Sequence, residues 1–501
     1  MRPELPGFYY DEEKNRYFPI KGPIPGSKAS SSSRTKQKPD PKPVQETNYQ
    51  KRTKLKALKL LYSRELNGNV IPVNKKMSNF EEEIQKTQAS YPEVWRYEST
   101  KNTGDAALKQ LQVDIQTSVG LIKKDIIVAG STEGCLSILR VSEPIQGFSD
   151  ESETQSLNGG IECDPVSVLP RKENNAEERK APGLILTHER CYHALSTISS
   201  IQLIGRYDES ENFHCVNRAL ITTLGNAGRG SPFFVNLDEE LNTITPQRLR
   251  GNVTSGCTIW TAECNRSGSH AAFGTDLGAA LVDLETGAGS YFLQSKSDVF
   301  ALQFDQSGKI VQCGLRNGAI VSVDLRDRPG RPFPRLTRHQ IRYQSSSKTS
   351  QTTKNKQWFE LKGNINPSHV IYMPSSITCL KTLKTYDQYL MASSMDGTIK
   401  LYDQRMDKRG GAVQTYEGHV NSHSRIEFGI DPSERFLISG GVDFYTRIWS
   451  IKSGQLLSEN KFSNSVFSAV CWSAAERQRD RKDSLVQGAW LGSCEAIFNM
   501  V

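Results

Sequence analysis

The sequence contains no apolar run close to the roughly 18 residues that a membrane-spanning helix needs. Its first residues, MRPELPGFYYDEEKN, also lack the basic and then apolar pattern of a secretory signal. The ten cysteines include no CxxC pair, so the sequence predicts neither a zinc site nor a disulfide framework. These absences favour reduced thiols in a protein of the nucleus, the cytoplasm or both, with no membrane partner.

Recognised catalytic and metal-binding motifs are also absent from the sequence. None of the eight histidines occurs in an HExxH or similar metal-ligand spacing. There is no phosphate-binding loop, nucleophile elbow or kinase signature. We therefore expect no enzyme activity, no cofactor and no metal ion.

The stretch 389–405, YLMASSMDGTIKLYDQR, has the pattern of two strands joined by a tight turn. An apolar run leads into the turn dipeptide Asp396-Gly397, and alternating apolar and polar residues follow. This unit is typical of a WD40 propeller blade, with Tyr402 at the position of the signature tryptophan.

The same unit recurs along the chain. Its further copies cover residues 126–139, 218–237, 270–284, 309–326, 434–449 and 485–498. Upstream of one copy, Gly418-His419 supplies the other half of the WD40 signature. About seven copies in register predict an all-β WD40 β-propeller of about seven blades.

Composition divides the chain into three parts. Residues 1–47 combine an aromatic motif, LPGFYYDEEKNRYF, with a linker rich in Ser, Pro and Lys that we expect to be disordered. The aromatic motif is dense enough to pack, either on this chain or on a partner. Residues 48–90 predict a helix–loop–helix, and residues 106–501 the propeller. Because an open ring leaves sheet edges exposed, we expect an N-terminal strand to complete the last blade.

The predicted helix pair has one apolar face and a strongly basic surface. The apolar residues of the first helix, within 48–66, fall on one side: Leu55, Leu58, Leu61 and Tyr62. Ser78 is the expected N-cap of the second helix, 79–89, whose first turn is acidic. The basic run is typical of nuclear localisation or a nucleic-acid patch. We favour partner docking and nuclear import over RNA binding, because no aromatics interleave with the lysines.

Two stretches exceed the length that seven blades require. Residues 143–182 are acidic and Ser-rich at first and then of mixed charge, whereas residues 328–362 are strongly basic. We expect both to form loop insertions between blades. The basic insertion offers a second route to nucleic acid or an acidic partner, although a solvated loop is the simpler expectation.

One group of residues invites comparison with a Ser-His-Asp triad. His419, Ser439, Asp443 and Trp449 contain the right residue types. All four also fall at WD40 intervals, where such residues form a buried hydrogen-bond chain within a blade. We therefore predict a structural hydrogen-bond chain here and no catalytic site.

Two Asp-x-Arg sequences close the third strands of consecutive predicted blades. They are Asp324-Leu325-Arg326 and Asp403-Gln404-Arg405. Residues two apart on a strand project to the same side, and equivalent strand ends of a propeller share one face. The planar guanidinium donates several hydrogen bonds at once, which suits a docking face. An ordinary solvent-facing arginine is the alternative interpretation.

These endings resemble the WDxR boxes of WD40 substrate receptors of cullin-4 ubiquitin ligases. The opening LPGFYYDEEKNRYF resembles the DDB1- and CUL4-associated factor four family, the WD-repeat 21 type. The resemblance implies that Arg326 and Arg405 bind the adaptor, damaged-DNA-binding protein 1, with Asp324 and Asp403 beside them. The boxes depart from the family in having Val323 and Tyr402 for tryptophan, so Arg405 matches better than Arg326.

The resemblance implies a non-catalytic receptor that links a protein substrate to a cullin-4 ligase through this adaptor. In several such receptors the helices before the propeller also contact the adaptor, which gives 48–66 and 79–89 a role. The alternative is a general WD40 scaffold of a nuclear complex that is RNA-associated through 328–362. The sequence does not identify the substrate.

Overall fold

The computed structural model of the chain contains two compact units, residues 1–48 and 49–501. The residues that it describes are 8–11, 16–19, 57–73, 76–117, 120–142, 161–163, 165–169, 183–187, 192–208, 213–225, 229–237, 246–249, 256–326, 337–340, 358–363, 365, 370–406, 411–472 and 488–501. In the first unit, β1 (Phe8–Asp11) and β2 (Arg16–Pro19) pair as an antiparallel hairpin. The aromatic motif of the sequence is therefore a two-stranded element, whereas the linker after it lies outside the described residues.

The second unit begins with two helices joined by a hairpin. They are α1 (Ala57–Asn67), β3 (Val70–Val73), β4 (Lys76–Asn79) and α2 (Phe80–Ala89). The connection that the sequence predicted as a loop is therefore a β-hairpin. The N-cap of α2 is Asn79, whose side chain accepts a hydrogen bond from the Glu81 amide at 2.8 Å. The expected cap, Ser78, instead pairs with Ile71 inside the hairpin ladder, so the helix begins one residue later than predicted.

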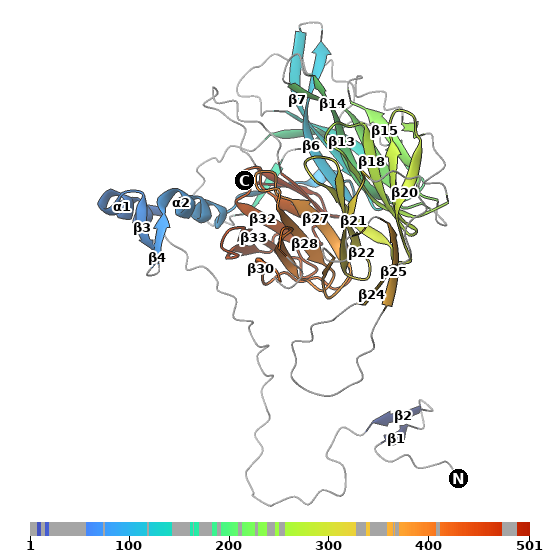
Figure 1. Cartoon of the computed structure of the whole chain (residues 1–501). Coiled ribbons are helices and arrows are strands. Elements are labelled where there is room, and N and C mark those ends of the chain that lie inside the picture. Colours follow the sequence, from blue (N-terminus) through green and yellow to red (C-terminus); the bar gives the residue numbers. More distant parts are fainter. Residues whose placement is uncertain are drawn as a thin grey trace, which may run out of the picture. The chain divides into compact units, whose positions relative to one another are not determined.

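Seven antiparallel sheets of described residues follow one another as propeller blades, which confirms the predicted fold (Figure 1). Blade 1 contains β6 (Ala107–Thr117), β7 (Gly120–Gly130), β8 (Cys135–Ser142), β11 (Leu184–Thr187) and β9 (Ile161–Cys163), and β12 (Tyr192–His193) pairs with β8. Blade 2 contains β13 (Ile198–Asp208), β14 (Phe213–Thr223), β15 (Pro232–Asn236) and β16 (Gln247–Arg248). Blade 3 contains β17 (Ile259–Cys264), β18 (His270–Thr275), β19 (Gly278–Asp283), β20 (Gly289–Ser295), β25 (Trp358–Gly363) and β24 (Thr337–Gln340).

The remaining four blades complete the ring. Blade 4 contains β21 (Val299–Phe304), β22 (Ile310–Leu315), β23 (Ala319–Asp324) and β26 (Ile371–Tyr372). Blade 5 contains β27 (Ile377–Thr382), β28 (Tyr389–Ser394), β29 (Ile399–Asp403) and β30 (Gln414–Tyr416). Blade 6 contains β31 (Phe428–Ile430), β32 (Phe436–Gly440), β33 (Thr446–Ser450) and β34 (Leu456–Asn460). Blade 7 contains β35 (Ala469–Trp472), β36 (Ala489–Gly492), β37 (Ile497–Met500), β5 (Val94–Tyr97) and β10 (Pro165–Leu169).

The N-terminal strand β5 closes the ring by pairing antiparallel with β37, the last strand of the chain. Glu93 and Val501 exchange backbone hydrogen bonds of 2.9 and 2.8 Å at the end of this ladder. The closure matches the expected N-terminal strand, but the propeller takes its first strand from residue 94, before the predicted boundary at 106. A four-residue strand among polar residues carries too little alternation to be recognised in sequence.

Parts of both predicted loop insertions are strands that widen blades. From 143–182, β9 pairs with β11 in blade 1, and β10 pairs with β5 in blade 7. From 328–362, β24 and most of β25 extend blade 3 beyond β20. These strands cover the outer edges of their sheets, which otherwise expose unpaired backbone groups. The rest of both insertions lies outside the described residues.

The core lies between neighbouring sheets, because alternate residues of each strand face opposite blades. In the first such layer, Ile126 of β7 and Ile201 of β13 are members of one buried cluster. The two blades approach each other closely at Gly130, since a Cβ atom there would lie 2.7 Å from the Ile198 side chain. Gly274 lies similarly close to Val299 of the next blade, and Gly314 to Ile377 of the blade after that. The same glycine contact is therefore repeated between successive blades.

Candidate protein-docking face

Arg326 lies at the corner where blade 4's third strand ends. Its backbone N–H donates to Asp324 Oδ1 at 3.0 Å, and its Nε donates to Oδ1 and Oδ2 at 2.9 and 3.0 Å. Hydrogen bonds from Arg326 hold the pKa of Asp324 down at about 2. The Arg326 side chain is 65% exposed to solvent although it is held by Asp324.

Blade 5 repeats this corner with Asp403 and Arg405. The Arg405 backbone N–H donates to Asp403 Oδ1 at 2.9 Å, its Nε to the same oxygen at 3.1 Å, and its Nη2 to Oδ2 at 2.9 Å. The Arg405 side chain is 67% exposed, and its hydrogen bonds lower the pKa of Asp403. The side chain of Gln404, the residue before Arg405, accepts a hydrogen bond of 2.7 Å from Gln312 of blade 4. The two arginine corners therefore lie on adjoining blades. Each carboxylate presets the direction of its arginine.

Lys452 occupies the equivalent corner of blade 6, two residues beyond the end of β33. Its Nζ pairs with Glu82 Oε2 of helix α2 at 3.0 Å. Arg435, in the turn between β31 and β32, donates to Gln85 of the same helix. Burial opposes ionisation of Glu82, but Lys452 and Lys86 still lower its pKa. Helix α2 is therefore attached at the propeller corner that matches Arg326 and Arg405.

Helix α1 carries an apolar stripe that faces solvent. The residues of this stripe are Leu58, Leu61, Tyr62 and Leu66. Leu58, Tyr62 and Leu66 follow one another at four-residue steps and Leu61 lies three residues after Leu58, so the four lie along one side of the helix. Leu58 is 78% exposed, whereas Leu60 packs with Ile71 and Phe80 in the small core of the hairpin. The predicted apolar face therefore exists, but Leu60 makes the internal contact; Leu55 lies outside the described residues.

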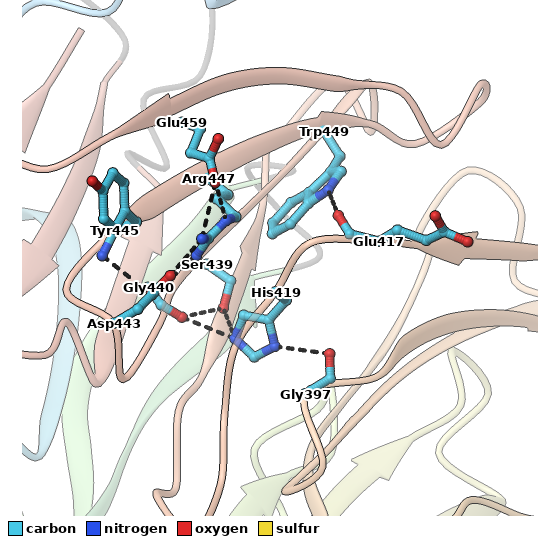
Figure 2. A network of polar contacts seen from close by, with 10 residues as sticks. All are labelled: Gly397, Glu417, His419, Ser439, Gly440, Asp443, Tyr445, Arg447, Trp449 and Glu459. Atoms are coloured by element: carbon cyan, nitrogen blue, oxygen red, sulfur yellow. Dashed lines mark hydrogen bonds and ion pairs between the residues drawn. The ribbon is translucent and has the colours of Figure 1, made fainter. Parts of the chain in front are cut away.

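His419 joins two blades through backbone carbonyls (Figure 2). Its Nε2 lies 2.9 Å from the Gly440 oxygen and 3.3 Å from the Ser439 hydroxyl, and its Nδ1 lies 3.2 Å from the Gly397 oxygen. Burial lowers the pKa of His419, which favours the neutral ring with a single N–H. This contact ties the blade 5 turn to β32 of blade 6.

Asp443 and Trp449 do not belong to the hydrogen-bond chain of His419 and Ser439. The predicted four-residue hydrogen-bond chain is therefore wrong for these two residues. Asp443 accepts from Arg447 Nη1 at 3.1 Å, and Arg447 Nε also donates to Glu459 at 3.1 Å (Figure 2). Trp449 Nε1 donates to the Glu417 carbonyl at 2.8 Å. The Arg447 side chain is only 4% exposed, and a buried guanidinium needs carboxylates close by. Arg447 therefore takes the aspartate that the sequence assigned to His419.

We expect Asp443→Ala to lower the free energy of unfolding by about 1–3 kcal/mol, because buried Arg447 would keep only Glu459. Urea melting of both proteins measures the difference. Asp298→Ala is the matched control, since its partner Arg316 is 65% exposed and such pairs contribute less than about 1 kcal/mol. Equal losses in the two variants would contradict the role given to Asp443.

Within the described residues, no helix is long and apolar enough to cross a membrane. In the same part of the chain, no group of three or more His, Cys, Asp or Glu side chains is arranged to hold a metal ion.

The seven closed blades and their strand–turn–strand repeats define a WD-repeat β-propeller. Residues 354–469 match the model of the DDB1- and CUL4-associated factor 4 β-propeller domain. Human DDB1- and CUL4-associated factor 4 is 25% identical over 464 residues, which cover 91% of this chain and 78% of the relative. The bovine protein of that name is 24% identical over the same shares. Human DDB1- and CUL4-associated factor 4-like protein 2 is 42% identical over 84 residues, 17% of this chain and 20% of the relative. The resemblance to this family is thereby confirmed.

The contact between Lys452 and helix α2 was not predicted from the sequence. A signal for it was present, because Lys452 follows Trp449 by three residues, as Arg405 follows Tyr402 and Arg326 follows Val323. The lysine lacks the preceding aspartate, so the pattern did not stand out. The partner Glu82 lies on a separate element whose docking the sequence does not encode locally.

Proposed function

We propose that this chain is a non-catalytic substrate receptor that binds damaged-DNA-binding protein 1 and so links a target protein to a cullin-4 ubiquitin ligase. The observation that carries the proposal is the repeated corner in adjacent blades, where a carboxylate presets an exposed arginine. The names of the similar proteins, which describe association with DDB1 and CUL4, support the same partner.

In this proposal the chain holds the adaptor on one face and the substrate on another, and carries out no chemical step itself. Arg326 and Arg405 are already oriented, so binding costs little side-chain entropy, and their guanidinium groups donate to adaptor carbonyls or carboxylates. Helix α2 is fixed at the next corner through Lys452, and α1 extends the face with its apolar stripe. Charged corners beside an apolar stripe give an interface both specificity and affinity. The rest of the propeller surface then remains for the substrate.

The test is complex formation between the purified full-length chain and purified damaged-DNA-binding protein 1. We expect one stable complex on gel filtration that largely survives a rise in NaCl from about 50 to about 200 mM, because buried arginine and apolar contacts resist salt. The scaffold alternative predicts no complex, but RNA binding whose affinity falls steeply over the same range. That pattern would replace the receptor assignment with the scaffold.

A further inference from the structure

A ring of polar side chains surrounds the propeller axis on the inner strands. The fifth residues of β13, β17, β21 and β27 are Gln202, Glu263, Gln303 and Lys381. In blade 1 the matching residue is Lys109, which pairs with Val128 two residues before Gly130. Glu263 pairs in the same way with Ala272, two residues before Gly274. Consecutive inner strands lie side by side around the ring, so these positions share one level.

Arg425 crosses the axis above this level. It lies three residues before the start of β31 (Phe428) in blade 6, and its Nη1 donates to the carbonyl oxygen of Ser199 at 3.0 Å and to that of Trp260. Ser199 belongs to blade 2 and Trp260 to blade 3. In a ring of seven, blades 2 and 3 lie opposite blade 6. The guanidinium therefore reaches from one side of the axis to the other.

The axis carries more positive than negative charge. Among the described residues, the carboxylates that act on Lys109, Lys381 and Arg425 are those of Glu263 and Glu427, and all five side chains are half-buried. Charges from blades 1, 3, 5 and 6 act on one another, which places them near a common point. Among the described residues, no direct ion pair joins any of the five. The excess cation is thus not neutralised by a protein carboxylate in contact with it.

The carboxylates do not remove this excess. Burial raises the pKa of Glu263 to about 7, although Lys109 and Lys381 act to lower it. Glu263 is therefore only partly ionised at neutral pH. Burial also acts to raise the pKa of Glu427, but the three cations together lower it, so this residue stays charged. The net charge at the axis is at least one positive unit, by the count of three cations against two carboxylates.

Two hydrogen-bond donors are also left without partners, one on Arg425 itself and one on Trp260, whose carbonyl oxygen Arg425 contacts. Its Nε and the indole N–H of Trp260 are buried and lack a hydrogen-bond partner. A buried donor without a partner is unfavourable in a folded protein, and each such group calls for an explanation. Excess positive charge and unpaired N–H groups both call for the same kind of ligand, one that brings negative charge and several acceptor oxygens.

We propose that the propeller axis binds a small divalent oxyanion of the sulfate or phosphate type, held by Lys109, Lys381 and Arg425. This site is independent of the docking face and goes beyond the proposed receptor function. The anion neutralises the excess charge and links inner strands of several blades. Its binding therefore stabilises the folded ring by mass action.

The experiment is isothermal titration calorimetry of the full-length chain with sodium sulfate, whose charge is constant near neutral pH. NaCl holds the ionic strength constant, and thermal melting up to about 10 mM sulfate gives a second readout. We expect saturable binding by the wild type. Lys109→Met and Lys381→Met should each weaken it about tenfold or more, because each removes a charged contact.

Glu427→Gln keeps the experiment decisive where a lysine variant fails to fold. It removes a competing negative charge, so we expect sulfate to bind more tightly than to the wild type. A merely structural role for Glu427 predicts weaker or unchanged binding. Arg316→Gln, an exposed arginine of the β22–β23 turn, is the control and should leave the affinity unchanged. Equal stabilisation of all variants, or no saturable binding by the wild type, would overturn the site.

Discussion

Arg405→Ala is expected to weaken binding of damaged-DNA-binding protein 1 by roughly thirty-fold or more. The loss of about 2–4 kcal/mol follows because a desolvated guanidinium satisfies several adaptor acceptors at once. The side chain is 67% exposed and, among the described residues, hydrogen-bonds to Asp403 alone, so the fold should not change. Surface plasmon resonance with immobilised adaptor measures the affinity, and a melting curve measures folding.

Three further variants make this result specific. Arg405→Lys should recover little, since an ammonium group cannot reproduce the planar fork. Arg326→Ala should add to the effect of Arg405→Ala if both corners share one interface. Arg316→Ala is a matched control, because Arg316 and Arg326 are both 65% exposed but Arg316 lies in the turn at the opposite end of β23. Wild-type affinity in the folded double variant would remove both arginines from the interface.

The sequence predicted the blades and the two arginine corners because both are local. A turn dipeptide, an alternating strand and an aspartate two residues before an arginine lie within about one blade unit. In the structure each arginine folds back on its own aspartate, so the geometry depends on three consecutive residues. Whether the corners bind an adaptor remains a prediction.

The sequence predicted that an N-terminal strand closes the ring, but it could not identify which distant segments of the chain pair with each other. Strand β5 pairs with β37 at the other end of the propeller, and β9 and β10 arise within a segment whose composition favours loops. No local pattern identifies their partners. Arg425 is another case, since its carbonyl partners in blades 2 and 3 lie opposite blade 6 only after the ring closes.

The polar network of blade 6 shows a different limit. The WD40 spacing correctly predicted that His419 contacts Ser439. It did not predict that Arg447 donates the hydrogen bond that Asp443 accepts. Arg447 lies on β33, whose five residues are all buried, and its charge attracts both Asp443 and Glu459. A buried guanidinium requires a carboxylate more strongly than a neutral imidazole does, so Asp443 pairs with Arg447. The spacing of residues in the sequence does not show this difference.

The double variant Leu58→Gln, Tyr62→Gln is expected to lower the affinity for damaged-DNA-binding protein 1 by roughly a hundred-fold or more. Both side chains belong to the solvent-facing stripe of α1, at 78% and 64% exposure. Full burial of one such side chain contributes about 1.5–3 kcal/mol, so losing two costs at least about 3 kcal/mol. Glutamine is a good helix former, and the internal contact of Leu60 is untouched, so α1 should stay folded.

Lys59→Gln on the same helix separates this outcome from binding to nucleic acid. Lys59 is exposed but lies outside the apolar stripe, so its loss should change adaptor affinity by less than about threefold. If the basic surface of α1 instead binds RNA, the lysine variant should weaken RNA binding, whereas the apolar variant should bind as the wild type does. Circular dichroism of each variant checks helix content. An apolar variant that keeps both its helix and its full adaptor affinity would show that the stripe does not contact the adaptor.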